Sequence, residues 1–230
     1  MKNHLFFDLD NTLWDHRKNA QLTLEMLFKR EELFEKYGLY FNDFYREYYT
    51  VNERLWELIR DGEITKEYLR EHRFLDTFAA FDIVDQSLAE RFENQFLDEI
   101  LQFNELVEGT SDLLEYLKSK DYTLHILSNG FKEVTQRKCE LSGIESYFHS
   151  IVSADEVGYR KPHASCFQFA LDKAGCKLEN TVFIGDDWIA DVLGANAFGM
   201  EAIFFDVFKD GYSAPGVKSI KHLSELKSLF

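Results

Sequence analysis

The sequence has few cysteines, no long apolar run and no excess of basic residues. Its three cysteines, Cys139, Cys166 and Cys176, are widely spaced and form no CxxC pair. They are therefore expected to be reduced, packed thiols rather than disulfides or zinc ligands. No apolar run approaches the roughly 20 residues of a membrane span, and the start MKNHLFFDLDN is too weakly apolar for a signal peptide. These absences predict a cytoplasmic protein that does not enter a membrane.

The charge balance also excludes classes of partner. Lys and Arg number 26 against 41 Asp and Glu, which gives a formal net charge of −15. Such a chain repels nucleic-acid backbones and anionic lipid surfaces on average, so neither is expected as a partner. A small anionic substrate stays possible, because the local field of a site can oppose that of the whole molecule. The sequence carries no signal for the oligomeric state.

The hydrophobic pattern divides the chain into two kinds of structure. Residues 4–8 are short and apolar, as in a buried strand, whereas residues 16–103 show helical spacing of apolar residues with no convincing strand. From about residue 110, strands such as YTLHIL, NTVFIG and EAIFFD alternate with helices. This alternation predicts an α/β fold with a doubly wound parallel sheet. The predicted core is 1–14 plus 105–230, with an inserted all-helical domain over 15–104.

Polar residues follow the apolar strands at four places. They are Asp8 and Asp10 after LFF, Ser128-Asn129-Gly130 after LHIL, Lys161 in GYRKP, and Asp186, Asp187 and Asp191 in GDDWIAD. Each group alone could be a turn or a helix cap. Because ligands of parallel sheets bind beyond the carboxyl ends of the strands, the four together predict one site.

The residue types in these groups suit phosphoryl chemistry. Clustered carboxylates without a histidine or cysteine pattern favour Mg²⁺. A lysine and a Ser-Asn-Gly turn offer positive charge and hydrogen-bond donors to an anion. One carboxylate can attack phosphorus, and a second can move the proton of the leaving group or of water.

In this arrangement the sequence resembles the haloacid dehalogenase-like (HAD) phosphatase superfamily. DLDNT matches its DxDxT motif, Ser128 and Lys161 match the second and third motifs, and GDDWIAD matches GDxxxxD. The resemblance implies a Rossmann-like core with a helical cap.

The resemblance also assigns roles to the motif residues. It implies that Asp8 is the nucleophile and Asp10 the general acid/base, while Lys161 neutralises the reacting groups. Mg²⁺ would be held by the Asp8 carboxylate, the Asp10 carbonyl and Asp186, supported through water by Asp187 or Asp191. Substrate contacts are expected from Thr12, Ser128, Asn129 and Gly130.

The substrate is expected to be a small phosphorylated metabolite. Dehalogenases of the superfamily lack the second acid, so Asp10 favours phosphate-ester hydrolysis. The stretch NERLWELIRDGEITKEYLREHRF resembles the YjjG-type pyrimidine 5′-nucleotidases, which makes a nucleotide the first candidate. Trp14, Asn52 and Arg73 could contact a base, although Arg73 could instead pair with a local glutamate.

Other functions fit the same residues. A sugar-phosphate phosphatase, a phosphoglycolate phosphatase or a phosphosugar mutase could use this core. A signalling receiver also uses an aspartate, Mg²⁺, a hydroxyl and a lysine, but it needs no large helical insert.

Overall fold

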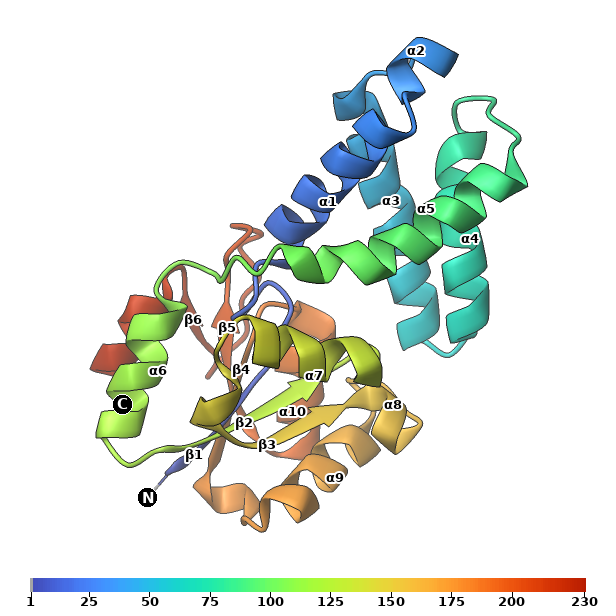
Figure 1. Ribbon diagram of the computed structural model, residues 1–230. Coiled ribbons are helices and arrows are strands. Elements are labelled where there is room, and N and C mark those ends of the chain that lie inside the picture. Colours follow the sequence, from blue (N-terminus) through green and yellow to red (C-terminus); the bar gives the residue numbers. More distant parts are fainter. Residues whose placement is uncertain (1) are drawn as a thin grey trace. The chain divides into compact units, whose positions relative to one another are not determined.

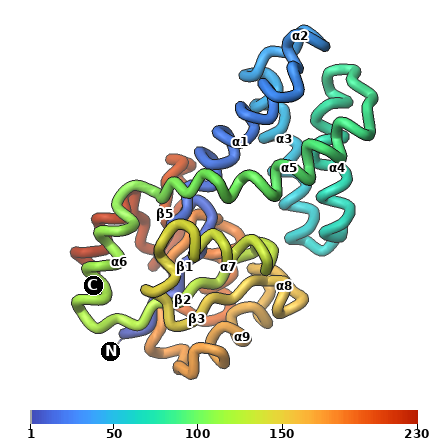
Figure 2. The backbone as a smooth tube through the Cα atoms, in the orientation of Figure 1, coloured from blue at the N-terminus to red at the C-terminus, as the bar shows by residue number. Residues whose placement is uncertain are grey.

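The computed structural model describes residues 2–230 and divides the chain into two compact units (Figure 1). The sheet unit is formed by Met1–His16 and Asn104–Phe230, and the helical unit by Arg17–Phe103. Figure 2 shows the chain leaving the sheet unit after its first strand and returning to it before helix α6 (Thr110–Ser119). The helical unit is thus an insertion into the sheet unit.

The sheet unit contains six parallel strands in the order β3-β2-β1-β4-β5-β6. The strands are β1 (His4–Phe7), β2 (Thr123–Ser128), β3 (Phe148–Ser153), β4 (Thr181–Gly185), β5 (Glu201–Phe205) and β6 (Lys218–Ile220). Leu5, Phe6 and Phe7 of the central strand β1 are fully buried, as expected of a parallel strand covered on both faces. The predicted doubly wound α/β fold is confirmed. The edge strand β6 was not predicted, because it is only three residues long and two of them are exposed.

Helices connect the strands and cover the sheet. They are α6, α7 (Lys132–Leu141), α8 (Ala154–Val157), α9 (Ala164–Ala174), a π-helix (Trp188–Leu193) and α10 (Gly194–Phe198), with 3-10 turns η2 (Glu145–Tyr147), η3 (Leu178–Asn180) and η5 (Leu223–Ser228). Phe167 of α9 packs edge-on against Phe183 of β4, with ring centroids 5.6 Å apart. Burial of such large rings supplies the main stabilisation of this layer.

The helical unit is built around aromatic rings. Its elements are α1 (His16–Arg30), α2 (Leu33–Tyr37), α3 (Phe41–Arg60), α4 (Lys66–Ala79), α5 (Gln86–Glu99) and η1 (Ile100–Gln102). Phe44 of α3, Phe74 and Phe78 of α4, and Phe92 of α5 contact one another with centroid distances of 5.1–6.5 Å. The apolar spacing of residues 21–39 predicts one helix, but the structure divides it, because Glu32 adopts a left-handed conformation with φ of 54°, which an α-helix cannot continue through.

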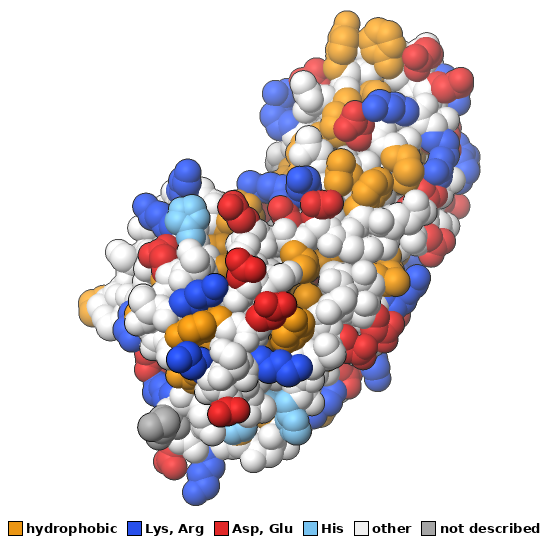
Figure 3. Space-filling view, turned by 60° about the vertical axis from the view of Figure 1, so that its left-hand side comes forward, with side chains coloured by type: hydrophobic (Ala, Val, Ile, Leu, Met, Phe, Trp, Pro, Cys, Tyr) orange, Lys and Arg blue, Asp and Glu red, His pale blue; other side chains and the backbone are white. Residues whose placement is uncertain are grey.

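The surface carries both signs of charge. On the face drawn in Figure 3, Lys and Arg side chains are interspersed with Asp and Glu, and hydrophobic side chains gather at the end that carries α2. Phe34, Tyr37 and Tyr40 of that segment are exposed. No helix within residues 2–230 is long and apolar enough to cross a membrane.

Candidate active site

The polar segments that follow the strands meet at one edge of the sheet. Asp8 directly follows β1, Ser128 ends β2, and Asp186 directly follows β4. Because β2, β1 and β4 are neighbours and run parallel, their carboxyl ends lie side by side. Lys161 comes from the segment between α8 and α9 and reaches the same place.

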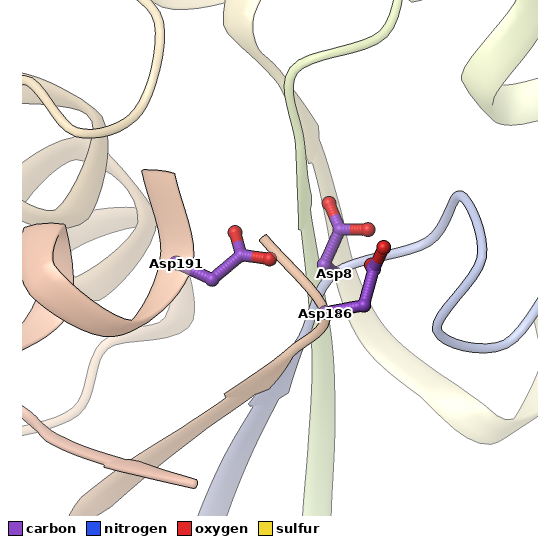
Figure 4. Close-up of side chains that lie close together, drawn as sticks. All are labelled: Asp8, Asp186 and Asp191. Atoms are coloured by element: carbon purple, nitrogen blue, oxygen red, sulfur yellow. The ribbon is translucent and has the colours of Figure 1, made fainter. Parts of the chain in front are cut away.

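Three carboxylates form a cluster at this edge. Oxygens of Asp8, Asp186 and Asp191 lie within 4.8 Å of one another, and Figure 4 shows the three side chains pointing toward a common point. Burial, followed by repulsion from Asp8 and Asp191, raises the pKa of Asp186 well above its usual value. Burial raises the pKa of Asp191 to about 7. The cluster is therefore short of positive charge, and its oxygen ligands suit a hard divalent cation.

Lys161 compensates part of this charge. Its Nζ donates to Asp8 Oδ1 at 2.6 Å and to Asp191 Oδ1 at 2.7 Å, and the residue is 1% exposed. Burial opposes the charged form of Lys161, but the Asp191 and Asp8 carboxylates outweigh it and raise its pKa, so the ammonium stays charged. For Asp8, burial outweighs Lys161, and the pKa of Asp8 is raised.

The structure separates the roles of Asp187 and Asp191, which the sequence had left unranked. Asp187 is exposed, and its Oδ1 accepts the N–H groups of Ile189 and Ala190, both at 2.8 Å. It therefore caps the π-helix and is not part of the cluster. Asp191 is buried and packs against Gly185, where a Cβ would lie 2.1 Å from Asp191 Oδ2. Only glycine at position 185 allows this approach.

Two of the predicted substrate contacts have hydrogen-bond partners within the protein. Thr12 is buried and donates to Asp186 Oδ1 at 2.8 Å, so it orients a carboxylate of the cluster. The Asn129 amide accepts the Lys161 N–H at 2.7 Å and donates to the Lys161 carbonyl at 3.0 Å. The Asn129 side chain thus positions Lys161, and its contact with a phosphoryl group stays a prediction.

The turn after β2 is packed closely. Ser128 Oγ accepts the Gly130 N–H at 3.0 Å. A Cβ at Gly130 would lie 3.0 Å from Thr135 Oγ1, 3.1 Å from Ser128 Oγ and 3.5 Å from Asp10 Oδ2. Gly130 therefore leaves room for the backbone of the turn beside Asp10.

Asp10 lies apart from the three-carboxylate cluster and has a lysine of its own. Lys138 Nζ of α7 donates to Asp10 Oδ1 at 2.5 Å, and His16 Nδ1 lies 3.8 Å from the same oxygen. Burial would raise the pKa of Asp10, but the Lys138 ammonium and His16 together hold that pKa below its usual value. The role of Lys138 was not predicted from the sequence. The sequence signal that could have indicated it is the position of Lys138 next to Cys139 and three residues after Thr135, on the buried face of the helix.

Trp14 belongs to the same group of contacts. It is fully buried, and Lys138 Nζ lies 4.2 Å from the centroid of its ring. With no exposed face, the ring offers no stacking surface for a base in this structure, which corrects the expectation from sequence.

The candidate contacts in the helical unit also differ from expectation in one case. Arg73 is buried and forms a two-pronged pair with Glu93, with distances of 2.9 and 2.6 Å. The alternative of a local glutamate pair is therefore correct, and Arg73 stabilises the bundle instead of binding substrate. Asn52 of α3 is 3% exposed, and its Oδ1 has no hydrogen-bond partner among the described residues.

Comparison with known proteins places these features in a family. A model of the haloacid dehalogenase-like hydrolases matches residues 2–199. The pyrimidine 5′-nucleotidase PynA of Streptococcus pneumoniae is 30% identical over 206 residues, which cover 88% of this chain and 83% of PynA. The pyrimidine 5′-nucleotidase YjjG of Escherichia coli is 28% identical over 198 residues, covering 85% of this chain and 82% of YjjG.

A solved structure supports the same conclusion about the fold. The magnesium-bound crystal structure of the HAD-hydrolase YfnB from Bacillus subtilis superposes with a TM-score of 0.89, covering 99% of this chain and 98% of that one, at 24% identity. The family model over residues 2–199 confirms, at the level of the family, the resemblance drawn from the DLDNT, Ser128, Lys161 and GDDWIAD motifs.

Proposed function

The chain belongs to the haloacid dehalogenase-like hydrolase family, and we propose that it is a Mg²⁺-dependent phosphatase acting on pyrimidine nucleoside 5′-monophosphates. The observation that carries this proposal is the division of labour between the two carboxylates of DLD. Asp8 lies in the cluster with Lys161, whereas Asp10 lies outside it with Lys138. One carboxylate is thus equipped to attack phosphorus and the other to move protons.

The residues at the site fit a magnesium ion. The raised pKa of Asp186 and the convergence of three carboxylates indicate a place where a cation would be stabilising. Asp8, Asp186 and the Asp10 carbonyl would hold Mg²⁺, with Asp191 in support. When bound, the ion would neutralise charge on the phosphoryl oxygens.

The residues of the chain perform the proposed reaction in two steps. In the first, an Asp8 oxygen forms a bond to phosphorus, the bond from phosphorus to the ester oxygen breaks, and Asp10 gives its proton to that oxygen. In the second, the Asp10 carboxylate takes a proton from water, the water oxygen bonds to phosphorus, and the bond to Asp8 breaks. Lys161 stays charged beside Asp8 throughout and offsets negative charge on the transferring group.

Asp10 has to take up a proton from solvent when the substrate binds. Lys138 favours the ionised form of Asp10 in the free protein, which suits the second step. An incoming phosphate dianion would raise the pKa of Asp10 by repulsion, which suits the first.

The substrate class is inferred from the relatives and from the helical unit. PynA and YjjG are both named pyrimidine 5′-nucleotidases. We propose that the helical unit serves as the cap that selects the substrate. Asn52 is its candidate for base recognition, because its buried Oδ1 is left without a partner among residues 2–230. An N–H group of a pyrimidine base can donate a hydrogen bond to such an oxygen.

A phosphate-release panel tests this function. UMP, dUMP and dTMP should be hydrolysed in preference to AMP, GMP and sugar phosphates when Mg²⁺ is present, and chelation should stop the release. Preference for a sugar phosphate or phosphoglycolate would overturn the nucleotide assignment and leave the phosphatase assignment. Isomerisation of a phosphosugar without release would indicate a mutase, and binding without turnover would indicate a receiver.

A further inference from the structure

We propose that Lys138 is a positioning residue: it holds one oxygen of Asp10 so that the other faces the phosphoryl-binding turn Ser128–Gly130. The inference rests on the proposed function, because it concerns how Asp10 protonates a leaving group. Lys138 lies in none of the sequence motifs that carry the family resemblance.

The first observation is the place of the ammonium. Lys138 is 5% exposed although it lies on a surface helix, and its Nζ lies between Asp10 Oδ1 at 2.5 Å and the Trp14 ring centroid at 4.2 Å. Burying a lysine costs free energy that only close partners can offset. Within residues 2–230, the Lys138 ammonium contacts one carboxylate oxygen and one aromatic face, so its position is fixed by Asp10 and Trp14.

The second observation is the direction of the free oxygen. While Asp10 Oδ1 accepts from Lys138, Oδ2 lies on the side of Gly130, 3.5 Å from where a Cβ of that glycine would be. The same point is 3.1 Å from Ser128 Oγ. The Asp10 side chain is 27% exposed and that of Lys138 only 6%. The lysine therefore stands behind the carboxyl group, and the carboxyl group faces the site.

The third observation is that the loop after β1 places Asp10 and Trp14 next to each other. Asn11 takes a left-handed turn with φ of 62°, and its N–H donates to the Trp14 carbonyl at 2.7 Å. Backbone pairing between Asp10 and Trp14 follows from this turn. Carboxylate and indole are thereby presented to one ammonium, while Lys161 serves Asp8 separately.

Two substrates whose leaving groups differ in basicity distinguish a positioning role of Lys138 from a purely structural one. An alkyl phosphate needs a proton on its leaving oxygen, whereas p-nitrophenyl phosphate releases a stable anion without one. kcat/KM reports steps up to departure of the leaving group. In Lys138→Met, kcat/KM for the alkyl ester UMP should fall on the order of tenfold to hundredfold more than kcat/KM for p-nitrophenyl phosphate.

Controls make the outcome unambiguous. Lys132→Met removes an exposed lysine from the same helix and should leave the ratio of the two kcat/KM values unchanged. Lys138→Gln keeps a donor without the charge and replaces the methionine variant if that one fails to fold; it should shift the ratio in the same direction. In an Asp10→Asn background, Lys138→Met should change the ratio no further.

The failure of this inference differs from failure of the proposed function. Equal loss on both substrates, or no loss, in the Lys138 variants would overturn the positioning role if Asp10→Asn itself shows the selective loss. If Asp10→Asn shows no selective loss, the general-acid role of Asp10 falls, and the proposed mechanism with it.

Discussion

At the scale of single residues, Asp8 and Asp10 each contact a different lysine, which offsets the repulsion between the two carboxylates. Lys161 contacts Asp8, and Lys138 contacts Asp10. The two acids then differ in character, since the pKa of Asp8 is raised and that of Asp10 is lowered. In the proposed mechanism, Asp8 serves as the nucleophile and Asp10 as the proton carrier.

Asp186 should destabilise the protein when no cation is present. The pKa of Asp186 is higher in the folded chain than the ordinary value near 3.9 of an unfolded aspartate. Ionisation of Asp186 as the pH rises above that value therefore favours the unfolded chain. Asp186→Asn should therefore raise the melting temperature at pH 7 in chelator, by about 2–4 °C for each kcal/mol relieved. It should also abolish the rise that Mg²⁺ gives to the natural protein.

Asp187→Asn is the matched control, because Asp187 caps a helix and an asparagine can do the same. It should keep the response to Mg²⁺. An unchanged Mg²⁺ shift in Asp186→Asn would place the ion elsewhere.

At the scale of secondary-structure elements, neighbouring strands carry a buried histidine that the site does not use. His125 of β2 is fully buried, contacts Ser150 Oγ at 2.8 Å through Nδ1, and lies 3.1 Å from His4 Nδ1 of β1. Burial, then the neighbouring His4 and His149, lowers the pKa of His125 to about 3. This ring is thus a neutral, structural part of the sheet.

His125 should make the sheet unit sensitive to acid. The unfolded chain binds a proton at His125 below about pH 6.5 and the folded chain does not, so stability is full above that pH and falls below it. The slope should be about 1.4 kcal/mol per pH unit for this proton. Urea unfolding of His125→Gln between pH 6.5 and 5 should show a flatter dependence. An unaltered slope in the His125 variant would contradict the assignment.

The sequence predicted elements better than side-chain partners. Apolar periodicity located five of the six strands and the helical insertion. This worked because burial of one face of a helix or strand gives its apolar residues a regular spacing along the sequence. It could not show that Thr12 binds Asp186, that Asn129 binds the Lys161 backbone, or that Lys138 reaches Asp10. Those contacts join residues 32 to 174 positions apart, and only the fold brings them together.

At the scale of the whole molecule, the acidic net charge and the lysines of the site act on different kinds of anion. The chain carries −15 overall, which disfavours polyanions, while two buried lysines lie at the carboxyl edge of the sheet. A small phosphate can contact these lysines and a cation bound by the carboxylates, whereas a nucleic acid would also meet the acidic surface. The proposed roles of the two units follow: the sheet unit performs chemistry, and the inserted helical unit selects the substrate.

Trapping the covalent intermediate tests the central claim, that Asp8 is the nucleophile, most directly. The enzyme with Mg²⁺ and UMP is quenched with borohydride, which reduces an aspartyl-phosphate to homoserine, and the modified residue is located by peptide mass spectrometry. We expect homoserine at position 8, enriched in Asp10→Asn, and loss of turnover by several orders of magnitude in folded Asp8→Asn. Modification at another residue, or sustained turnover by Asp8→Asn, would contradict it.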